Sequence, residues 1–186
     1  MTIMYKGRRM DFMNLNILLK KFFFIVVISL FFIPVHSEEK EVPIKEHKFN
    51  FYSGMFDFSD DGKRSAIFGL QHQNESLFRD SFLGTLSPVT GALITADNAT
   101  YFYTGVQAEY KLGNINLTPS FTPGLYHEGD GKDLGHIVEF KSEIQLSLDL
   151  LNNNEFGFSY NHISNASLGE KNPGANSYMF NFLKNF

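Results

Sequence analysis

The chain has 186 residues, with 16 basic and 20 acidic side chains and a formal net charge of −4. It contains no cysteine, which excludes disulfides and thiol chemistry, and its acidic balance excludes nucleic acid as an expected partner. Its six histidines lack the spacing of metal ligands, so we expect neither a metal nor a cofactor.

The N-terminal region has the pattern of a secretory signal peptide. Two lysines precede an uncharged, largely apolar run at residues 22–33, and small or branched residues follow up to position 37. A membrane anchor is the alternative, but a spanning helix needs roughly 20 apolar residues. We therefore expect a signal peptide at 1–37 and a single domain at 38–186. Removing the peptide takes away five basic residues and one acidic residue, which lowers the net charge from −4 to −8.

Eight stretches of the remaining chain are predicted to be strands. Apolar and polar side chains alternate along most of them, as expected for strands with two different faces. A strand that spans a membrane needs about 9–11 residues, and most of these stretches reach that length. The expected strands cover residues 49–58, 65–73, 82–95, 100–111, 114–127, 136–150, 155–164 and 176–186.

This pattern predicts an all-β fold, an eight-stranded antiparallel transmembrane β-barrel in the outer membrane of a Gram-negative bacterium. With both ends of the domain in the periplasm, the outward connections are 59–64, 96–99, 128–135 and 165–175, and the inward turns are mostly shorter. An eight-stranded barrel is filled by side chains, so charged lumen residues should pair or hydrogen-bond with one another instead of lining a pore. These residues are Glu109, Glu139, Lys141, Glu143 and Glu155.

Some features leave the details of the barrel open. Pro119 and Pro123 remove ladder donors, so we expect a bulge or an irregular strand there. Aromatic residues occupy both parities of 49–58, which leaves the register of the first strand ambiguous. The last strand ends in Phe186, through which we expect the barrel-assembly machinery to recognise the chain. A homodimer is compatible with the sequence.

The last two strands carry a candidate nucleophile and base. Counting by twos places His162 and Ser164 on the aromatic face of one strand, and Asn176 on the aromatic face of the next. The histidine could take the hydroxyl proton while the serine attacks an ester carbonyl, and a group on the neighbouring strand would orient the imidazole. Such groups on an apolar face indicate a lipid substrate; the alternative is an ordinary polar strand end.

The same residues resemble those of the PagL family of lipid A 3-O-deacylases. The resemblance rests on His162-x-Ser164-Asn165-Ala166, on the Asn172-Pro173-Gly174 loop, on residues 123–142 and on the terminal aromatic strand, and it covers roughly residues 100–186. It implies an outer-membrane barrel that hydrolyses the acyl ester at position 3 of lipid A, in the lipopolysaccharide leaflet. It further implies that His162 is the base, Ser164 the nucleophile and Asn165 an oxyanion donor.

One position departs from the family pattern. The best-known members carry glutamate where this chain has Asn176. An asparagine can hold a neutral histidine in the right tautomer but cannot stabilise the imidazolium by charge, which predicts a slower enzyme. Glu170, in the same outer loop, is an alternative source of the carboxylate. Two alternatives stay open: a non-catalytic barrel with a structural or surface-interaction role, and a periplasmic lipid carrier, which would place its aromatics inside.

Overall fold

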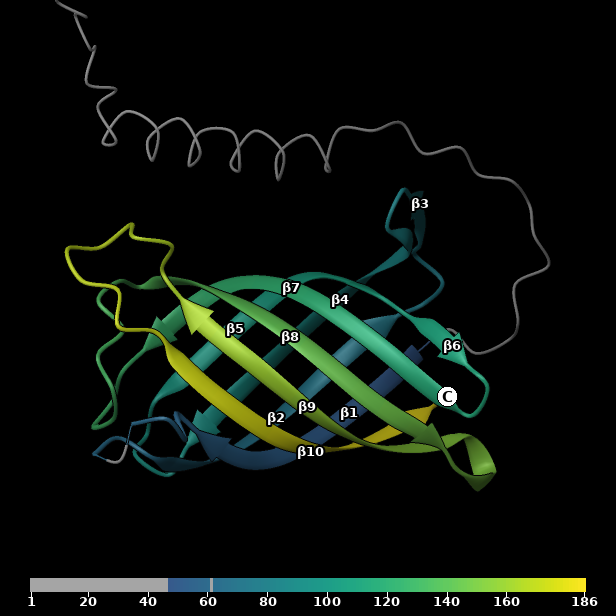
Figure 1. Cartoon of the computed structure of the whole chain (residues 1–186), viewed down its shortest axis with the longest axis horizontal. Coiled ribbons are helices and arrows are strands. Elements are labelled where there is room, and N and C mark those ends of the chain that lie inside the picture. The colour runs from purple at the N-terminus through teal and green to yellow at the C-terminus, as the bar shows by residue number, and fades with distance from the viewer. Residues whose placement is uncertain (1–46, 61) are drawn as a thin grey trace, which may run out of the picture. The chain divides into compact units, whose positions relative to one another are not determined.

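The structure is a computed structural model that describes residues 47–60 and 62–186; the expected signal peptide lies outside these residues. Within the described residues, no helix is both long and apolar enough to cross a membrane. The elements, shown in Figure 1, are β1 (His47–Phe56), β2 (Ser65–Asn74), β3 (Arg79–Ser81), β4 (Gly84–Thr95), β5 (Thr100–Ala108), β6 (Tyr110–Leu112), β7 (Ile115–His127), β8 (Val138–Asp149), the short 3-10 helix η1 (Leu151–Asn153), β9 (Asn154–Ser164) and β10 (Ala175–Asn185).

The strands form one closed antiparallel sheet. The order β2-β1-β10-β9-β8-β7-β5-β4 returns to its start because β2 also pairs with β4. β6 continues the line of β5 along β7, and the short β3 folds back on β4, so eight strands make the barrel. The predicted fold is confirmed. Pairing of β1 with β10, from Lys48 opposite Asn185 to Met55 opposite Tyr178, settles the register that the sequence left open.

The two prolines interrupt the sheet on one side only. The ladder between β7 and β8 runs without a break through Pro119 and Pro123. On the other side, pairing with β5 and β6 is missing opposite both prolines, although the paired segments keep one register throughout. Proline has no N–H to donate, so the lost pairs lie on the side that these two residues face. The expected irregularity is therefore a gap in the ladder and not a bulge.

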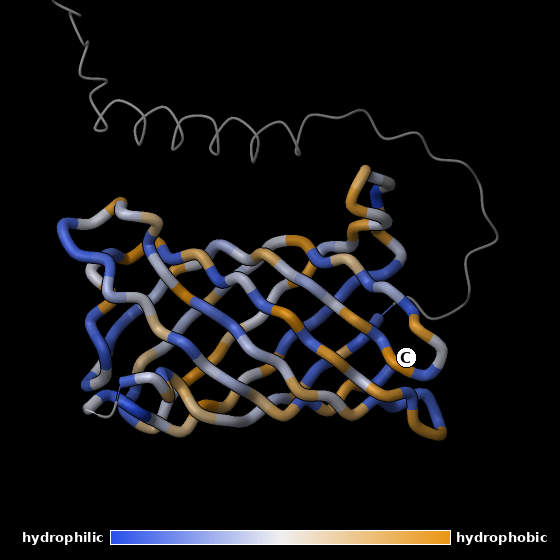
Figure 2. The backbone as a smooth tube through the Cα atoms, in the orientation of Figure 1, coloured by the Kyte–Doolittle hydropathy of each residue, from blue (hydrophilic) through white to orange (hydrophobic). Residues whose placement is uncertain are grey.

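The distribution of side chains is inverted relative to a soluble protein. Hydrophilic and hydrophobic residues alternate along the strands (Figure 2), and the apolar ones face outward. The outer wall exposes large side chains such as Leu146, Leu148, Phe156, Phe158, Phe180 and Phe182, while the lumen buries Gln73, Gln107, Asn161, Ser177 and Asn181. This is the pattern of a membrane barrel and not of a carrier that holds a lipid inside.

Ion pairs hold most of the charges in the lumen, as predicted. The ammonium group of Lys48 lies 2.6 Å from Glu109, 2.9 Å from Glu155 and 3.2 Å from Glu75. Lys141 lies 2.7 Å from Glu143 and 4.0 Å from the centre of the Tyr103 ring. Glu139 departs from the prediction: it is buried, yet no ion pair joins it to another described residue. The nearest lysine along its own strand, Lys141, pairs with Glu143 instead.

The triple contact of Lys48 predicts a large effect of removing its charge. Lys48→Met would leave the buried Glu155 and the half-buried Glu109 without their cation, which should cost about 3–5 kcal/mol of unfolding free energy. Urea unfolding in lipid vesicles would measure this loss. Lys111→Met is the matched control, because Lys111 is 68% exposed and 3.9 Å from Glu109, and it should cost at most about 1 kcal/mol. Equal, small losses in both variants would contradict the role of Lys48.

Candidate active site

The predicted site residues meet at one end of the barrel. This end, called the loop rim below, carries the connections 57–64, 96–99, 128–137 and 165–174 (Figure 1). β9 ends there and β10 begins there. His162 is exposed on the outer wall of β9, Ser164 is half-buried on the same face, and Asn176 is the direct cross-strand partner of His162. The alternation of the sequence thus brings all three to the outside of the wall, as predicted.

Asn176 holds the imidazole of His162 through a hydrogen bond. Its side-chain oxygen lies 2.8 Å from Nδ1 of His162, and the hydroxyl of Tyr160 donates to the same oxygen at 2.8 Å. Its amide nitrogen donates to the hydroxyl of Ser59 at 3.1 Å. A carbonyl oxygen only accepts hydrogen bonds, so this network assigns the ring proton to Nδ1. Nε2 of His162 is then free to accept a proton, as a general base requires.

Gly174 packs against the imidazole from the end of the β9–β10 loop. It has a φ of +63°, a conformation that glycine adopts without steric cost. A Cβ at this position would lie 2.8 Å from Cε1 and 3.3 Å from Nε2 of His162. A side chain here would push the ring away, so the glycine of the Asn-Pro-Gly loop helps to fix the position of the base.

A second serine, not identified from the sequence, lies beside the base. Ser142 on β8 is the direct cross-strand partner of His162 on the side opposite Asn176, and it is exposed on the same wall. Directly paired residues have Cβ atoms about 4.5–5.5 Å apart. Ser164 is two residues from His162 along its own strand, a separation of roughly 7 Å. The proximity of Ser142 to His162 follows from the register between β8 and β9, which the alternation of a single strand does not predict.

Asn165 turns inward and connects two loops. Its side chain is fully buried, and its amide nitrogen donates to the carbonyl oxygens of Leu134 and Lys171, both at 2.8 Å. Its side-chain oxygen accepts from the N–H of Ser167 at 2.9 Å. Both donors of the amide are engaged, so donation to an oxyanion would require the exchange of one of these bonds.

Glu170 lies on the exposed part of the β9–β10 loop. The Nδ1 position of His162, which its carboxylate would have to reach, is occupied by Asn176.

The neighbouring Lys171 forms an ion pair with Asp133 and so joins the loops 165–174 and 128–137. Asp133 accepts hydrogen bonds from the side chain of Lys171 and from the N–H of Gly135, and these bonds lower the pKa of Asp133 below its ordinary value. The bond to Asp133 also raises the pKa of Lys171.

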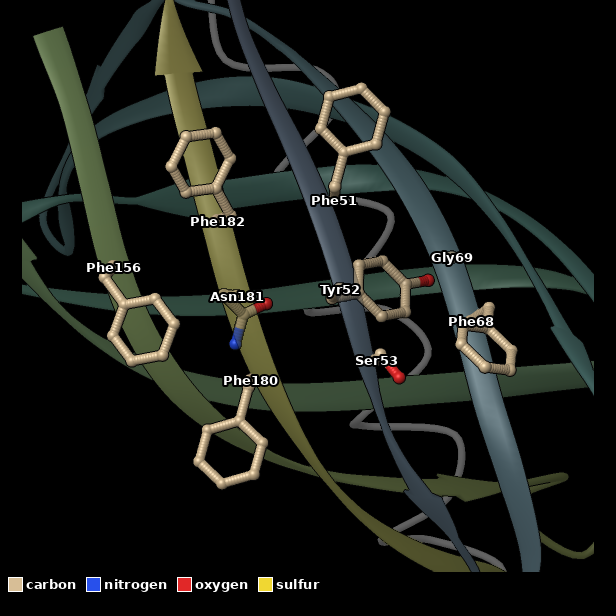
Figure 3. A pocket seen from close by; sticks show the side chains of 9 residues that line it. All are labelled: Phe51, Tyr52, Ser53, Phe68, Gly69, Phe156, Phe180, Asn181 and Phe182. Carbon is tan, nitrogen blue, oxygen red and sulfur yellow. The ribbon is translucent and has the colours of Figure 1, made fainter.

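Below the loop rim, the outer wall has an apolar groove at the seam between β1 and β10 (Figure 3). Its volume is about 400 Å³, and Ser53 and Gly69 supply small residues among its aromatic walls. Those walls are Phe51, Phe68, Phe156, Phe180 and Phe182. β10 therefore connects Asn176, near its start, with the groove farther along the same strand. A groove of this composition suits a hydrocarbon chain.

Among the described residues, no group of three or more histidine, aspartate and glutamate side chains is placed to hold a metal ion. At the loop rim, Asn176 orients the imidazole of His162, and Ser142 and Ser164 lie on the same outer face.

The comparisons with known proteins concern the family and the fold of the chain. Residues 57–185, well over half of the chain, match the family model described as lipid A 3-O-deacylase (PagL). The crystal structure of the outer membrane enzyme PagL superposes with a TM-score of 0.55 at 18% identity, covering 74% of this chain and 98% of that chain, which shows a shared fold. A structure described as de novo design of transmembrane beta-barrels has a TM-score of 0.49 at 12% identity, covering 79% of this chain and 100% of that chain. The search of curated proteins found no match. The chain belongs to the PagL family of lipid A 3-O-deacylases, whose barrel resides in the outer membrane.

Proposed function

We propose that this protein is an esterase that removes the 3-O-linked acyl chain from lipid A, acting on the outer wall of its barrel. The observation that carries the proposal is the hydrogen bond between Asn176 and Nδ1 of His162, which leaves Nε2 as a base on the strand face that also carries Ser164. The loop rim carries most of the longer connections, and in outer-membrane barrels the longer connections face the cell exterior. The site then lies at the depth of the lipopolysaccharide leaflet, where lipid A resides.

The proposed reaction proceeds through an acyl-enzyme. Nε2 of His162 takes the hydroxyl proton of Ser164 as the serine oxygen attacks the ester carbonyl carbon. The tetrahedral intermediate collapses, the ester C–O bond breaks, and the imidazolium gives its proton to the departing sugar oxygen, which leaves as a hydroxyl. Water, activated by the same base, then hydrolyses the acyl-serine and releases the fatty acid.

For the developing oxyanion we propose Asn165 as a donor. The turn that begins at this residue supports the assignment: Ala166 and Ser167 both have positive φ, +52° and +64°. Residues held in such sparsely populated conformations cluster at functional sites. One of the amide bonds that Asn165 makes to loop carbonyls would be exchanged for the oxyanion during the reaction.

Asn176 is proposed as the third member of the site. It supplies the orientation of the imidazole but no negative charge, so turnover should be slower than with a carboxylate at this position. Glu170 would contribute only if the β9–β10 loop rearranged so that the Glu170 carboxylate took the place of the Asn176 oxygen at Nδ1 of His162.

The acyl chain needs no cavity inside the barrel. Lipid A lies in the same leaflet as the outer wall, so its chains reach the site by lateral diffusion. The groove lined by Phe180 and Phe182 is proposed to receive the hydrocarbon, since burial of apolar surface is favourable by about 25 cal/mol per Å².

Replacing the nucleophile tests the reaction. Ser164→Ala should lower kcat by at least about 10³-fold, because the acyl-enzyme can no longer form. Mass spectrometry of lipid A from cells that express each variant would show whether one hydroxyacyl mass is lost. Ser142→Ala is the comparison, since this serine is the direct cross-strand partner of His162. Loss of activity in Ser142→Ala alone would reassign the nucleophile, and unchanged lipid A with folded wild-type protein would favour a non-catalytic barrel.

Asn176→Glu tests the cost of the missing carboxylate. We expect kcat to rise by about tenfold or more, because removal of the corresponding carboxylate from a serine-protease triad costs about 10⁴-fold. Initial rates on purified lipid A in detergent would measure this change. An equal or lower kcat in a folded variant would show that the site is already optimal with an amide.

Gly174→Ala tests the packing against the base. The added methyl group would displace the ring of His162, and a misplacement of about 1 Å can cost about 10²-fold in rate. The deacylation rate should fall by at least about tenfold. Gly62→Ala is the control, because a Cβ there meets only the Asp60 carboxylate at an ordinary 3.7 Å, and its rate should equal that of the wild type. Equal rates in both variants would remove Gly174 from the site.

A further inference from the structure

A buried aspartate at the loop rim is linked to Nδ1 of His162 by three successive hydrogen bonds, through Ser59 and Asn176. Asp57 follows β1 directly, and its side chain is 1% exposed. One carboxylate oxygen lies 2.5 Å from the ammonium of Lys132. The other accepts from the backbone N–H of Asn176 and from the hydroxyl of Ser59, each at 3.3 Å. Asp57 thus contacts Asn176 directly through its backbone and, through Ser59, reaches its side chain.

The backbone fixes Asp57 in this place. Its φ is +49°, a region that non-glycine residues seldom occupy and that aspartate tolerates better than most. Its own N–H donates to the hydroxyl of Ser177 at 3.4 Å, and the N–H of Phe58 donates to the carbonyl of Asn176 at 2.9 Å. The turn after β1 is therefore bonded to β10 at two successive residues, and one of them is Asn176.

The direction of each hydrogen bond between Asp57 and His162 follows from the carboxylate of Asp57. A carboxylate only accepts, so the single hydroxyl hydrogen of Ser59 points toward Asp57. Ser59 can then only accept from Asn176, which turns the amide nitrogen of Asn176 toward Ser59 and its oxygen toward His162. The proton of the imidazole is consequently held on Nδ1.

We infer that Asp57 is a positioning residue that sets the tautomer of His162 through Ser59 and Asn176, in place of a carboxylate bonded directly to the ring. Its catalytic consequence rests on the proposed function; the tautomer does not.

The local charge supports the role of Asp57. Lys132 is shared between Asp57 and Asp60, the latter at 3.4 Å, so this cluster has a net charge of −1. When His162 gains a proton during turnover, that negative charge acts on it through polarised hydrogen bonds.

Nuclear magnetic resonance can read the tautomer without any turnover. The protein would be labelled with ¹⁵N-histidine in detergent micelles, with the His162 signals assigned by comparison with His162→Gln. We expect the wild type to carry its proton on Nδ1. Ser59→Ala removes the link yet keeps the pair of Asp57 and Lys132, and it should give a detectable Nε2–H population. Asp57→Asn should do the same, because an amide can donate to Ser59.

Ser142→Ala is the matched control, since Ser142 lies next to His162 but outside the chain of bonds, and it should keep the wild-type tautomer. Wild-type tautomers in both Ser59→Ala and Asp57→Asn would overturn the inference, whether or not the protein deacylates lipid A.

Kinetics separate positioning from mere support of the loop rim. Asp57→Asn should lower kcat by about tenfold with KM unchanged, whereas in the Asn176→Glu background it should lower kcat by less than about threefold. The reason is that a glutamate only accepts, so it holds the proton on Nδ1 without help. Equal losses in the two backgrounds, or a loss confined to KM, would overturn the inference. Absence of turnover in the wild type would refute the proposed function. The tautomer measurement would then decide by itself whether Asp57 positions the imidazole of His162.

Discussion

The pairing of the first strand with the last is the constraint on which the rest of the structure depends. Closure between β1 and β10 removes the sheet edges, which satisfies the backbone hydrogen bonds that a bilayer could not. The same seam forms the apolar groove and sets the turn after β1 against the start of β10. The position of Asp57 beside Asn176 is thus a direct consequence of barrel closure.

A barrel with an apolar outside must place its polar groups within a narrow lumen. Lys48 lies among three carboxylates, and Lys141 is shared between a carboxylate and an aromatic ring. Such pairs fill the interior with side chains in contact, which is consistent with a packed barrel and not with a channel. The proposed chemistry accordingly takes place on the outer wall, where His162 is exposed.

The candidate active site has no carboxylate and no lysine among its groups at the wall, which are His162, Ser164, Tyr160 and Asn176. Exposed charges would be costly against hydrocarbon. The carboxylate of Asp57 is buried at the loop rim and paired with Lys132. A site of this kind can orient a base next to lipid without placing an ion in contact with it.

The sequence by itself determined the strands, the two faces of each strand and the outward position of His162, Ser164 and Asn176, because a period of two is a local property of the chain. It could not determine the partners of groups far apart along the chain. The contacts of Asn176 with Ser59 and Asp57 join residues 117 and 119 positions apart, and the approach of Ser142 to His162 depends on register between strands. The inward turn of Asn165 and the gap opposite Pro119 also appear only when neighbouring strands and loops are in place. Register and closure are non-local, so only the tertiary structure decided them.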